Sequence, residues 1–386
     1  MMRDRGLGPN AGLIGEPGGL ARITTPALVL RLDLFERNLA HMGEFLGASG
    51  LKIRPHSKTH KCSEIAKRQI AAGGLGVCCA TLHEAEAMVA AGVAGVLITS
   101  PVVGPAKIER LAQLNGKADG LMVVADHPDT VHEIAAAVRM AGSALTVLVD
   151  VDVGMQRTGV ASIPAAVELA RLIGESEGLS FGGIQGYSGM VQHIEDYGDR
   201  AATYGVHLDR FAATAAALEK AGIAPAIVTG GGTGTIAIDA ERGVINEHQA
   251  GSYAFMDVEY NIVEIVEIVE DRGAPPFATA LTMRNTVVSA NADGFVTIDG
   301  GFKCFATDGP FPELYDGAPA GARYAYFGDE HGRIEFANEG ETLPLGSQVE
   351  LVTPHCDPTV NLHDYIHAVR GDVIEAIWRI DARGVL

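Results

Sequence analysis

The chain has 386 residues, of which 47% are hydrophobic, and this length exceeds that of a typical single domain, so we expect two domains. Its formal net charge of −19 argues against nucleic acid as a partner, because a phosphate-binding surface needs a basic footprint. The first 20 residues lack the apolar region of a signal peptide, and no uncharged window reaches transmembrane length, so no membrane partner is expected. The five cysteines form no CxxC zinc pattern and their odd number fits no closed disulfide framework, which favours a reducing cytoplasm.

Apolar, strand-like runs alternate with amphipathic helical segments over the first two thirds of the chain. Eight candidate strands cover Lys52–Lys58, Gly76–Thr81, Gly95–Ser100, Gly120–Asp126, Leu145–Asp152, Phe181–Gly189, Ala226–Gly232 and Ala250–Asp257. Helical spacing marks segments between them, including Leu82–Ala91, Ala106–Asn115, Pro128–Ala141, Pro164–Glu175 and Arg200–Ala221. Continuously hydrophobic strands that alternate with helices are typical of parallel strands buried on both faces. Eight such units predict a (β/α)8 barrel of the TIM type, an α/β fold.

The pattern changes after the last of these runs. Glu264, Glu267 and Glu270 punctuate pairs of Ile and Val, a spacing that a solvated face explains better than an interface. Pro275-Pro276 then breaks the chain. Strand-like runs follow at Ala278–Ser289, Gly294–Ile298, Arg323–Phe327, Gln348–Val352 and Val373–Ile380. Turn residues separate these runs, so we predict a smaller C-terminal β domain.

The segment Arg54-Pro55-His56-Ser57-Lys58-Thr59-His60-Lys61 places a lysine among basic and imidazole groups at the end of an apolar run. A lysine amine is nucleophilic only when deprotonated, and neighbouring cations or burial lower its pKa toward that state. Lys58 is therefore a candidate Schiff-base lysine at the C-terminal end of a barrel strand, where barrel active sites are built. A basic loop that binds an anion explains the same residues equally well.

At this motif the chain resembles the pyridoxal phosphate enzymes of the alanine-racemase-like fold, and more narrowly the family of D-threonine aldolases and 3-hydroxyaspartate aldolases, with D-serine dehydratase as a relative. The resemblance covers nearly the whole chain and implies that Lys58, rather than Lys61, carries the cofactor. It also implies that the strand Ala27–Leu32 joins the C-terminal strands. The cofactor-binding barrel would then be residues 34–262, and residues 1–33 and 263–386 would form the β domain with the metal site. A homodimer is implied, with residues 306–309 contributing across the interface.

A second motif, Thr229-Gly230-Gly231-Gly232-Thr233-Gly234-Thr235, suits an anion. Consecutive glycines let backbone N–H groups converge on one point, and threonine hydroxyls add donors. The lysine of a P-loop is absent, which argues against nucleoside triphosphate hydrolysis. The resemblance implies that this loop holds the cofactor phosphate through Thr229, Gly231, Gly232, Thr233 and Gly234, with Tyr253 nearby.

The same glycines have a rival interpretation as the dinucleotide fingerprint of an oxidoreductase. Gly232, Gly234 and Ala237 fit its loose spacing, and Asp257 lies about the right distance downstream to contact a ribose. A dinucleotide fingerprint opens an early βαβ unit, however, whereas this one follows six earlier strands. We therefore disfavour the oxidoreductase.

Two further candidate groups follow predicted strand ends. Arg157 lies in Asp152-Val153-Gly154-Met155-Gln156-Arg157 and could form a charge-assisted hydrogen bond with an anionic oxygen. The sequence of this segment, taken alone, is better explained by a structural ion pair. The resemblance implies that Arg157 approaches the ring hydroxyl of the cofactor. Tyr187 is a candidate to stack on the ring. His193 is a candidate acid or base, or simply a hydrogen-bonded structural histidine.

Near the C-terminus, Pro354-His355-Cys356-Asp357 places an imidazole and a carboxylate two residues apart. On an extended segment both side chains lie on the same side, and the pair suits Mn, Co, Ni, Zn or Mg. The resemblance implies that His355 and Asp357 are the metal pair, with Asp where D-serine dehydratase has Cys. His363 and His367, four apart on an expected helix, are better explained as an exposed pair than as a second metal site.

These features together imply a metal-dependent pyridoxal phosphate lyase that cleaves D-β-hydroxy amino acids, of the D-threonine or 3-hydroxyaspartate type, to glycine and an aldehyde. The Schiff base between Lys58 and the cofactor would be exchanged for one between the substrate amine and the cofactor, and His60 or His193 would take the β-hydroxyl proton. A dehydratase or racemase would share Lys58 and the glycine loop. A noncatalytic pyridoxal phosphate carrier is the alternative of another class, but the C-terminal domain with its metal pair disfavours it.

Overall fold

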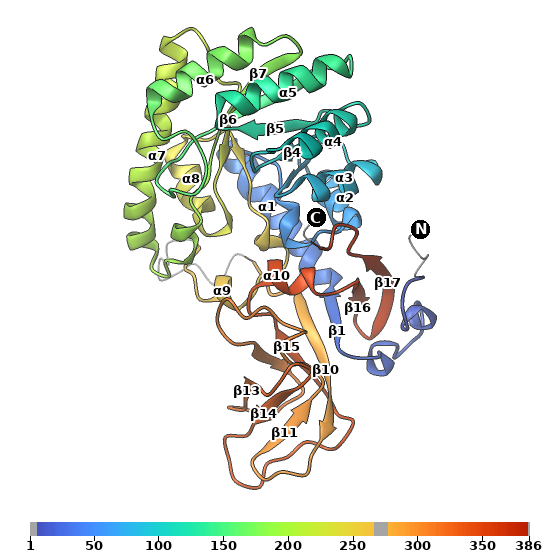
Figure 1. Ribbon diagram of the computed structural model, residues 1–386. Coiled ribbons are helices and arrows are strands. Elements are labelled where there is room, and N and C mark those ends of the chain that lie inside the picture. Colours follow the sequence, from blue (N-terminus) through green and yellow to red (C-terminus); the bar gives the residue numbers. More distant parts are fainter. Residues whose placement is uncertain (1–5, 266–276, 385–386) are drawn as a thin grey trace.

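The computed structural model describes residues 6–265 and 277–384. Glu267, Glu270, Pro275 and Pro276, which the sequence analysis used, lie outside these residues. Eight parallel strands flanked by helices form the upper part of the molecule in Figure 1, and a mostly β part lies below them. The predicted fold class, a TIM-type barrel with a smaller C-terminal β domain, is confirmed.

The barrel strands are hydrogen-bonded in the order β2-β9-β8-β7-β6-β5-β4-β3, and all their pairings are parallel. Their bounds are β2 Lys52–Ile53, β3 Val77–Cys79, β4 Val96–Ile98, β5 Met122–Ala125, β6 Leu145–Asp150, β7 Leu179–Gly186, β8 Ile227–Gly230 and β9 Glu247–His248. Beyond β2, His56 forms a parallel bridge with Cys78 of β3. This bridge joins the two ends of the sheet.

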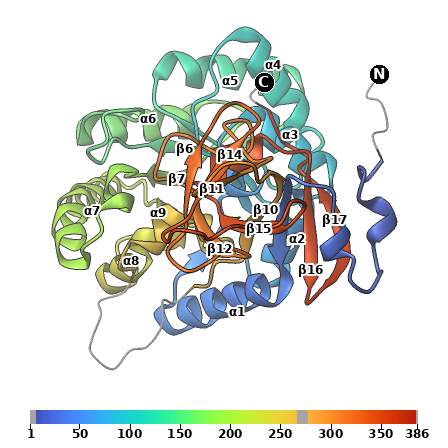
Figure 2. The same cartoon turned by 90° about the horizontal axis from the view of Figure 1, so that it is seen from below.

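Helices surround the barrel strands, as Figure 2 shows from below. They are α1 Leu32–Ser49, α2 Ser63–Ala71, α3 Leu82–Ala90, α4 Pro105–Asn115, α5 Pro128–Met140, α6 Ile163–Glu175, α7 Tyr197–Lys220 and α8 Ile236–Arg242. The side chains of Thr81, Ser162 and Asp196 cap α3, α6 and α7 by accepting a backbone N–H of the first turn, and proline occupies the first turn of α4, α5 and α6. All five predicted helices are confirmed to within three residues at each end.

Two predicted strands are wrong in detail. The segment Ala250–Asp257 is not a strand: the last barrel strand precedes it, and Ser252–Ala254 forms a 3-10 turn. This turn is buried against α1, where the side-chain amide of Asn38 donates to the carbonyl of Ala254, so its apolar run imitates a buried strand. The first strand ends at Ile53, and Lys58 lies beyond it in the 3-10 turn Ser57–Thr59.

The β domain is built around the long strand β10, which pairs with β1, β11 and β15. Its strands are β1 Ala27–Arg31, β10 Leu281–Ser289, β11 Phe295–Ile298, β12 Glu313–Asp316, β13 Arg323–Tyr326, β14 Gly332–Glu335, β15 Gln348–Val352, β16 Tyr365–Arg370 and β17 Val373–Arg379. Five of them were predicted in the C-terminal third, whereas β12, β14 and β16 were missed. The N-terminal strand β1 lies between β10 and β16, so the chain enters this sheet before it builds the barrel and returns afterwards.

Two short helices, α9 Val258–Asn261 and α10 Cys356–Asn361, lie where the barrel meets the β domain (Figure 1). Viewed from below, the β domain strands cross the same end of the barrel (Figure 2). This junction brings residues near the two ends of the sequence together. In the part of the chain that the structure describes, none of the helices combines the length and hydrophobicity needed to span a bilayer.

Candidate active site

Lys58 lies at the junction between the barrel and the β domain. Its 3-10 turn begins at His56, whose ring nitrogen Nδ1 accepts the backbone N–H of Lys58 at 3.3 Å. The Lys58 ammonium forms an ion pair and hydrogen bond with Oδ2 of Asp357 in α10. The two side chains are 36% and 13% exposed, respectively, so the pair is only partly screened by water. A barrel residue and a β-domain residue therefore share one site.

A cavity of about 320 Å³ opens beside Lys58. Among its lining residues are His56, Thr99, Arg157, Gln185, Tyr187 and Gln249. The guanidinium of Arg157 lies 5.5 Å from the centroid of the Tyr187 ring, so a cation–π contact holds the two together. The structure thus brings Lys58, Arg157 and Tyr187 to the same cavity.

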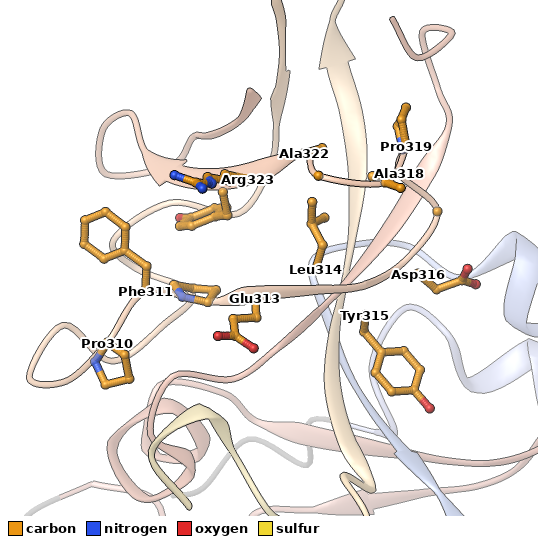
Figure 3. Close-up of a pocket in the computed structure, with 15 residues that line it drawn as sticks. Pro310, Phe311, Glu313, Leu314, Tyr315, Asp316, Ala318, Pro319, Ala322 and Arg323 are labelled. Carbon is orange, nitrogen blue, oxygen red and sulfur yellow. The ribbon is translucent and has the colours of Figure 1, made fainter. Parts of the chain in front are cut away.

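A larger cavity of about 630 Å³ lies in the β domain, between residues 310 and 324 (Figure 3). Phe311, Tyr315 and Arg323 are among its labelled side chains, and its lining contains no lysine, histidine or cysteine. Because the smaller cavity contains Lys58, the candidate Schiff-base lysine, together with His56 and Arg157, we place the candidate active site there.

The lysine was expected to have a lowered pKa, and this expectation is wrong. Burial is the largest single influence and lowers the pKa of Lys58, but Asp357, Tyr187 and Cys356 together outweigh burial and raise this pKa above its usual range. The neighbouring imidazoles are not cationic: burial lowers the pKa of His56 to about 3 and that of His60 to about 4. The sequence showed the basic neighbours of Lys58 but not its acidic partner.

The glycine loop follows β8 and continues into a 3-10 turn, Thr233–Thr235, and then α8. The N–H of Gly232 donates to the hydroxyl of Thr235 at 3.0 Å, and the N–H of Gly234 donates to Oε1 of Gln192 at 3.0 Å. Gly231 has φ +73°, and a Cβ there would lie 2.5 Å from both Asp239 and His248, so only glycine fits. The predicted loop residues Thr229, Gly231, Gly232, Thr233 and Gly234 are all at one strand end.

A buried polar network lies under this loop. The carboxylate of Asp239 accepts hydrogen bonds from the hydroxyls of Tyr204 and Thr235, at 2.9 and 2.8 Å, and contacts Nε2 of His248 at 3.0 Å. His248 Nδ1 accepts the N–H of Ala250, which leaves the proton on Nε2 to donate to Asp239. The network fixes the loop conformation from below.

Tyr253 is connected to the glycine loop by its backbone, because its N–H donates to the Thr233 hydroxyl at 3.0 Å. Its own hydroxyl accepts from the side-chain amide of Gln69 at 3.3 Å, and its ring is buried. The side chain of Tyr253 therefore supports the loop from the core and does not line the cavity beside Lys58.

His355 and Asp357 lie close together, although not on the extended segment that was expected. His355 is the N-cap of α10, and Asp357 lies in its first turn. Nε2 of His355 is 3.9 Å from Oδ2 of Asp357, the same oxygen that contacts Lys58. Lys58 and His355 hold the pKa of Asp357 well below its usual range, although burial alone would raise it. One carboxylate oxygen thus faces both the lysine and the histidine.

Three acidic residues near this pair were not predicted as part of the site: Asp257 was considered only as a ribose contact, residues 306–309 only as an interface segment, and Glu259 was not considered. Oδ2 of Asp308 lies 2.9 Å from Nδ1 of His355. Glu259 lies between His355 and His193, 3.8 and 3.7 Å from their Nδ1 atoms, and its Oε2 is buried without a hydrogen-bond partner. Asp257 is fully buried and accepts the N–H groups of Tyr260 and Cys356, which ties α9 to the start of α10. The Asp257-x-Glu259 spacing after an apolar run is a sequence signal for two of them.

The two candidate histidine bases lie in different surroundings. His193 is about half exposed and faces Glu259, beside the His355–Asp357 pair. Burial and the charge of His355 lower the pKa of His193, which favours its neutral form. His60 is fully buried: its Nδ1 accepts the N–H of Cys62, and its Nε2 donates to Gln69. The structure does not bring His60 to the cavity.

The second histidine pair and the cysteines have structural partners. His363 and His367 do not share a helix, because His367 lies in β16 and hydrogen-bonds the Leu28 carbonyl, while His363 hydrogen-bonds the Cys304 carbonyl. The expected exposed helical pair is therefore wrong. All five cysteines are free and buried, and Sγ of Cys356 is 3.8 Å from Oδ1 of Asp357.

Comparison with known proteins shows what the chain is similar to. The family model of the alanine racemase N-terminal domain matches residues 30–259, and that of a serine dehydratase domain matches residues 280–369. D-threonine aldolase of Arthrobacter sp is 40% identical over 370 residues, 96% of this chain and 95% of that protein. 3-hydroxy-D-aspartate aldolase of Paracoccus denitrificans (strain Pd 1222) is 36% identical over 366 residues, 94% and 93% of the two chains. The crystal structure of D-threonine aldolase from Filomicrobium marinum matches with a TM-score of 0.89 and 39% identity, over 94% of this chain and 96% of that one.

The barrel, the β domain and the lysine beside its cavity define an enzyme of the alanine-racemase-like class, whose fold implies pyridoxal phosphate. Within this class the chain belongs to the family of D-threonine aldolases and 3-hydroxy-D-aspartate aldolases, which are lyases. The residues present fit the cofactor: Lys58 offers an amine at the cavity, and Arg157 and Tyr187 line the same cavity. The predicted family is confirmed.

Proposed function

We propose that this protein is a pyridoxal phosphate- and divalent-metal-dependent aldolase that cleaves D-β-hydroxy amino acids to glycine and an aldehyde. Relatives that match nearly its whole length are named D-threonine aldolase and 3-hydroxy-D-aspartate aldolase. The observation that carries the proposal is the position of Asp357, whose Oδ2 faces both the cofactor lysine and His355. A substrate whose amine takes the cofactor from Lys58 would therefore react beside the His355–Asp357 pair.

The cofactor, when bound, supplies an electron sink for the carbanion that develops at the substrate Cα. Lys58 would hold it, and the glycine loop residues Thr229, Gly231, Gly232, Thr233 and Gly234 would bind its phosphate. Arg157 and Tyr187, paired at the cavity wall, would orient its ring. The buried network around Asp239 keeps the loop rigid, so little ordering is needed when the cofactor binds.

His355 and Asp357 would hold a divalent ion, which supplies a Lewis acid that lowers the pKa of the β-hydroxyl. Imidazole and carboxylate are a harder ligand set than imidazole and thiolate, which favours Mn, Co, Ni or Mg over tightly held Zn. Among the described residues no third His, Cys, Asp or Glu completes a ready set of ligands, so water or substrate would fill the other positions.

His193 is the group that takes the β-hydroxyl proton. It is half exposed, neutral and next to His355, whereas both ring nitrogens of His60 are occupied inside the core. Glu259 faces Nδ1 of His193 and orients its ring. His60 is accordingly assigned a structural role.

The proposal also covers the domain bounds, the oligomeric state, the partners and the cellular compartment. We assign the cofactor-binding barrel to residues 34–262 and the metal-bearing β domain to residues 1–33 and 263–386. The protein acts on a small molecule as a homodimer and needs neither nucleic acid nor membrane. Within each chain, residues 306–309 lie beside the metal pair, where Asp308 contacts His355. Its five free, buried cysteines suit a reducing cytoplasm.

A dehydratase is the alternative, because it would use the same cofactor and lysine but expel the β-hydroxyl instead of deprotonating it. Product analysis separates the two reactions. Purified enzyme with pyridoxal phosphate and Mn should convert D-threonine to glycine and acetaldehyde and leave L-threonine unchanged. Lys58→Ala is the matched inactive control. Ammonia and 2-oxobutyrate as major products would show that the protein is a dehydratase.

A further inference from the structure

The lysine that would carry the cofactor contacts the carboxylate that would hold the metal. Lys58 Nζ contacts Oδ2 of Asp357, and the same Oδ2 faces Nε2 of His355 at 3.9 Å. An ion bound between His355 and Asp357 would therefore lie directly beside the Lys58 ammonium. Two cations compete for one oxygen.

The burial of these groups makes the competition strong. Asp357 is 13% exposed and His355 22% exposed, so solvent screens little of the repulsion between the ammonium and an incoming ion. The remaining neighbours do not relieve it. Asp308 and Glu259 face Nδ1 of His355, on the far side of its ring from Asp357.

We propose that cofactor and metal bind this protein cooperatively, because attachment of the cofactor removes Lys58 from Asp357. The inference rests on the proposed function, which assigns the lysine and the metal pair. The Lys58 ammonium loses one proton to solvent, and its nitrogen attacks the aldehyde carbon of the cofactor. The new C=N bond replaces the aldehyde C=O bond, whose oxygen leaves as water. Asp357 is then released to bind the metal.

Linkage makes the effect reciprocal. If the cofactor increases the affinity for the metal by some factor, the metal increases the affinity for the cofactor by the same factor. Coupling between ligand sites is typically about 5- to 150-fold. A site in which the Lys58 ammonium and the metal compete for one carboxylate should lie within that range, and we expect at least about tenfold.

The test is the dissociation constant of Mn, measured by isothermal titration calorimetry on the full chain at fixed pH and salt. Four proteins are compared: wild type with cofactor, wild type freed of cofactor, and cofactor-free Lys58→Gln and Lys58→Arg. Glutamine removes the charge, and arginine keeps it, while neither forms the covalent bond. Wild type with cofactor and Lys58→Gln should each bind Mn at least about tenfold more tightly than cofactor-free wild type, and Lys58→Arg should remain weak.

The outcomes distinguish the inference from the proposed function. Equal Mn affinity in cofactor-free wild type and Lys58→Gln would overturn the competition while leaving the metal site intact. Loss of Mn binding in His355→Ala confirms that the measured site is the metal pair. Absence of Mn binding in every form, including wild type with cofactor, would overturn the metal-dependent function itself.

Discussion

Asp308 lies 2.9 Å from Nδ1 of His355, at the opposite end of the imidazole from Asp357. The segment that carries it is fixed two residues earlier, where Ala306 donates its N–H to Thr359 of α10 and accepts the hydroxyl of Tyr326. A carboxylate that accepts Nδ1–H sets the tautomer and direction of a histidine whose Nε2 binds a metal. Asp308 is therefore positioned to orient His355.

The first prediction concerns this carboxylate. Asp308→Ala should weaken Mn binding by about 10- to 100-fold, the usual effect of losing the partner of a metal-bound histidine. Asp308→Asn, which keeps an acceptor without the charge, should have a smaller effect. Calorimetric titration of the cofactor-loaded protein measures both. Asp293→Ala, which removes an exposed carboxylate from a turn, is the control, and an Asp308→Ala affinity equal to that of Asp293→Ala would contradict the assignment.

The second prediction separates the two lysines of the motif. Lys58→Ala should abolish cofactor that borohydride can fix to the protein, and peptide mapping of the reduced wild type should find it on Lys58. Lys61 instead pairs with Glu84 at 2.8 Å, with side chains 11% and 2% exposed. Lys61→Met should keep the covalent cofactor but lower the free energy of unfolding by about 3–5 kcal/mol, because Glu84 is left buried and unpaired.

Urea unfolding measures that loss, and the chain offers a matched control. Lys61→Met combined with Glu84→Gln removes the uncompensated charge, so stability should recover in part. Cofactor found on Lys61 in the reduced wild type would show that the lysine assignment is wrong.

The third prediction concerns the metal pair. Chelation, His355→Ala and Asp357→Ala should each suppress cleavage of D-threonine, while the absorbance of the bound cofactor persists. The reason is that the metal would act on the substrate hydroxyl and the cofactor is held by Lys58. Mn or Co added after chelation should restore wild type but neither variant. Full turnover in thoroughly demetallated protein would be incompatible with this mechanism.

The fourth prediction is a pH dependence of stability that arises from His60. Burial lowers the pKa of His60 to about 4, whereas an unfolded histidine titrates near 6.5. Below pH 6.5 the unfolded state binds a proton that the native state does not bind. The contribution of His60 is therefore fully present above pH 6.5 and is lost as pH falls toward 4, at about 1.4 kcal/mol per pH unit.

Urea unfolding of wild type and His60→Asn at pH 7 and pH 5 tests this slope. Asparagine does not titrate, so the difference in unfolding free energy between the two proteins should shrink by about 2 kcal/mol at pH 5. The same difference at both pH values would mean that His60 is accessible to protons in the native state. A catalytic base at residue 60 would then need to be reconsidered.

The sequence predicted the barrel well because its elements are local. The βα alternation, the capping residues Thr81, Ser162 and Asp196, and the prolines of first turns all act within a few residues, so helix bounds were accurate. The segment Ala250–Asp257 failed because a compact buried turn and a buried strand have the same hydrophobic pattern. Strand β16 was missed because its histidine at residue 367 was interpreted on a helical period.

The sequence predicted individual residues of the candidate site but not the contacts and charges that surround them. Motifs identified Lys58, Arg157, Tyr187, His355 and Asp357, and the structure brings them to one junction. The raised pKa of Lys58, by contrast, depends on a carboxylate from the other end of the chain. No local pattern contains that contact, and for the same reason Asp308 and Glu259 were not predicted as part of the site.

The ion pair between Lys58 and Asp357 joins residues that are 299 positions apart in the sequence. A ribosome adds roughly 5–20 residues per second, so the acidic partner emerges about 15–60 s after the lysine. The barrel strands that follow Lys58 are synthesised during that interval, whereas α10 is not yet present. Assembly of the site is therefore among the last events in the biosynthesis of each molecule, and a chain that stops before α10 carries the lysine without the groups that control it.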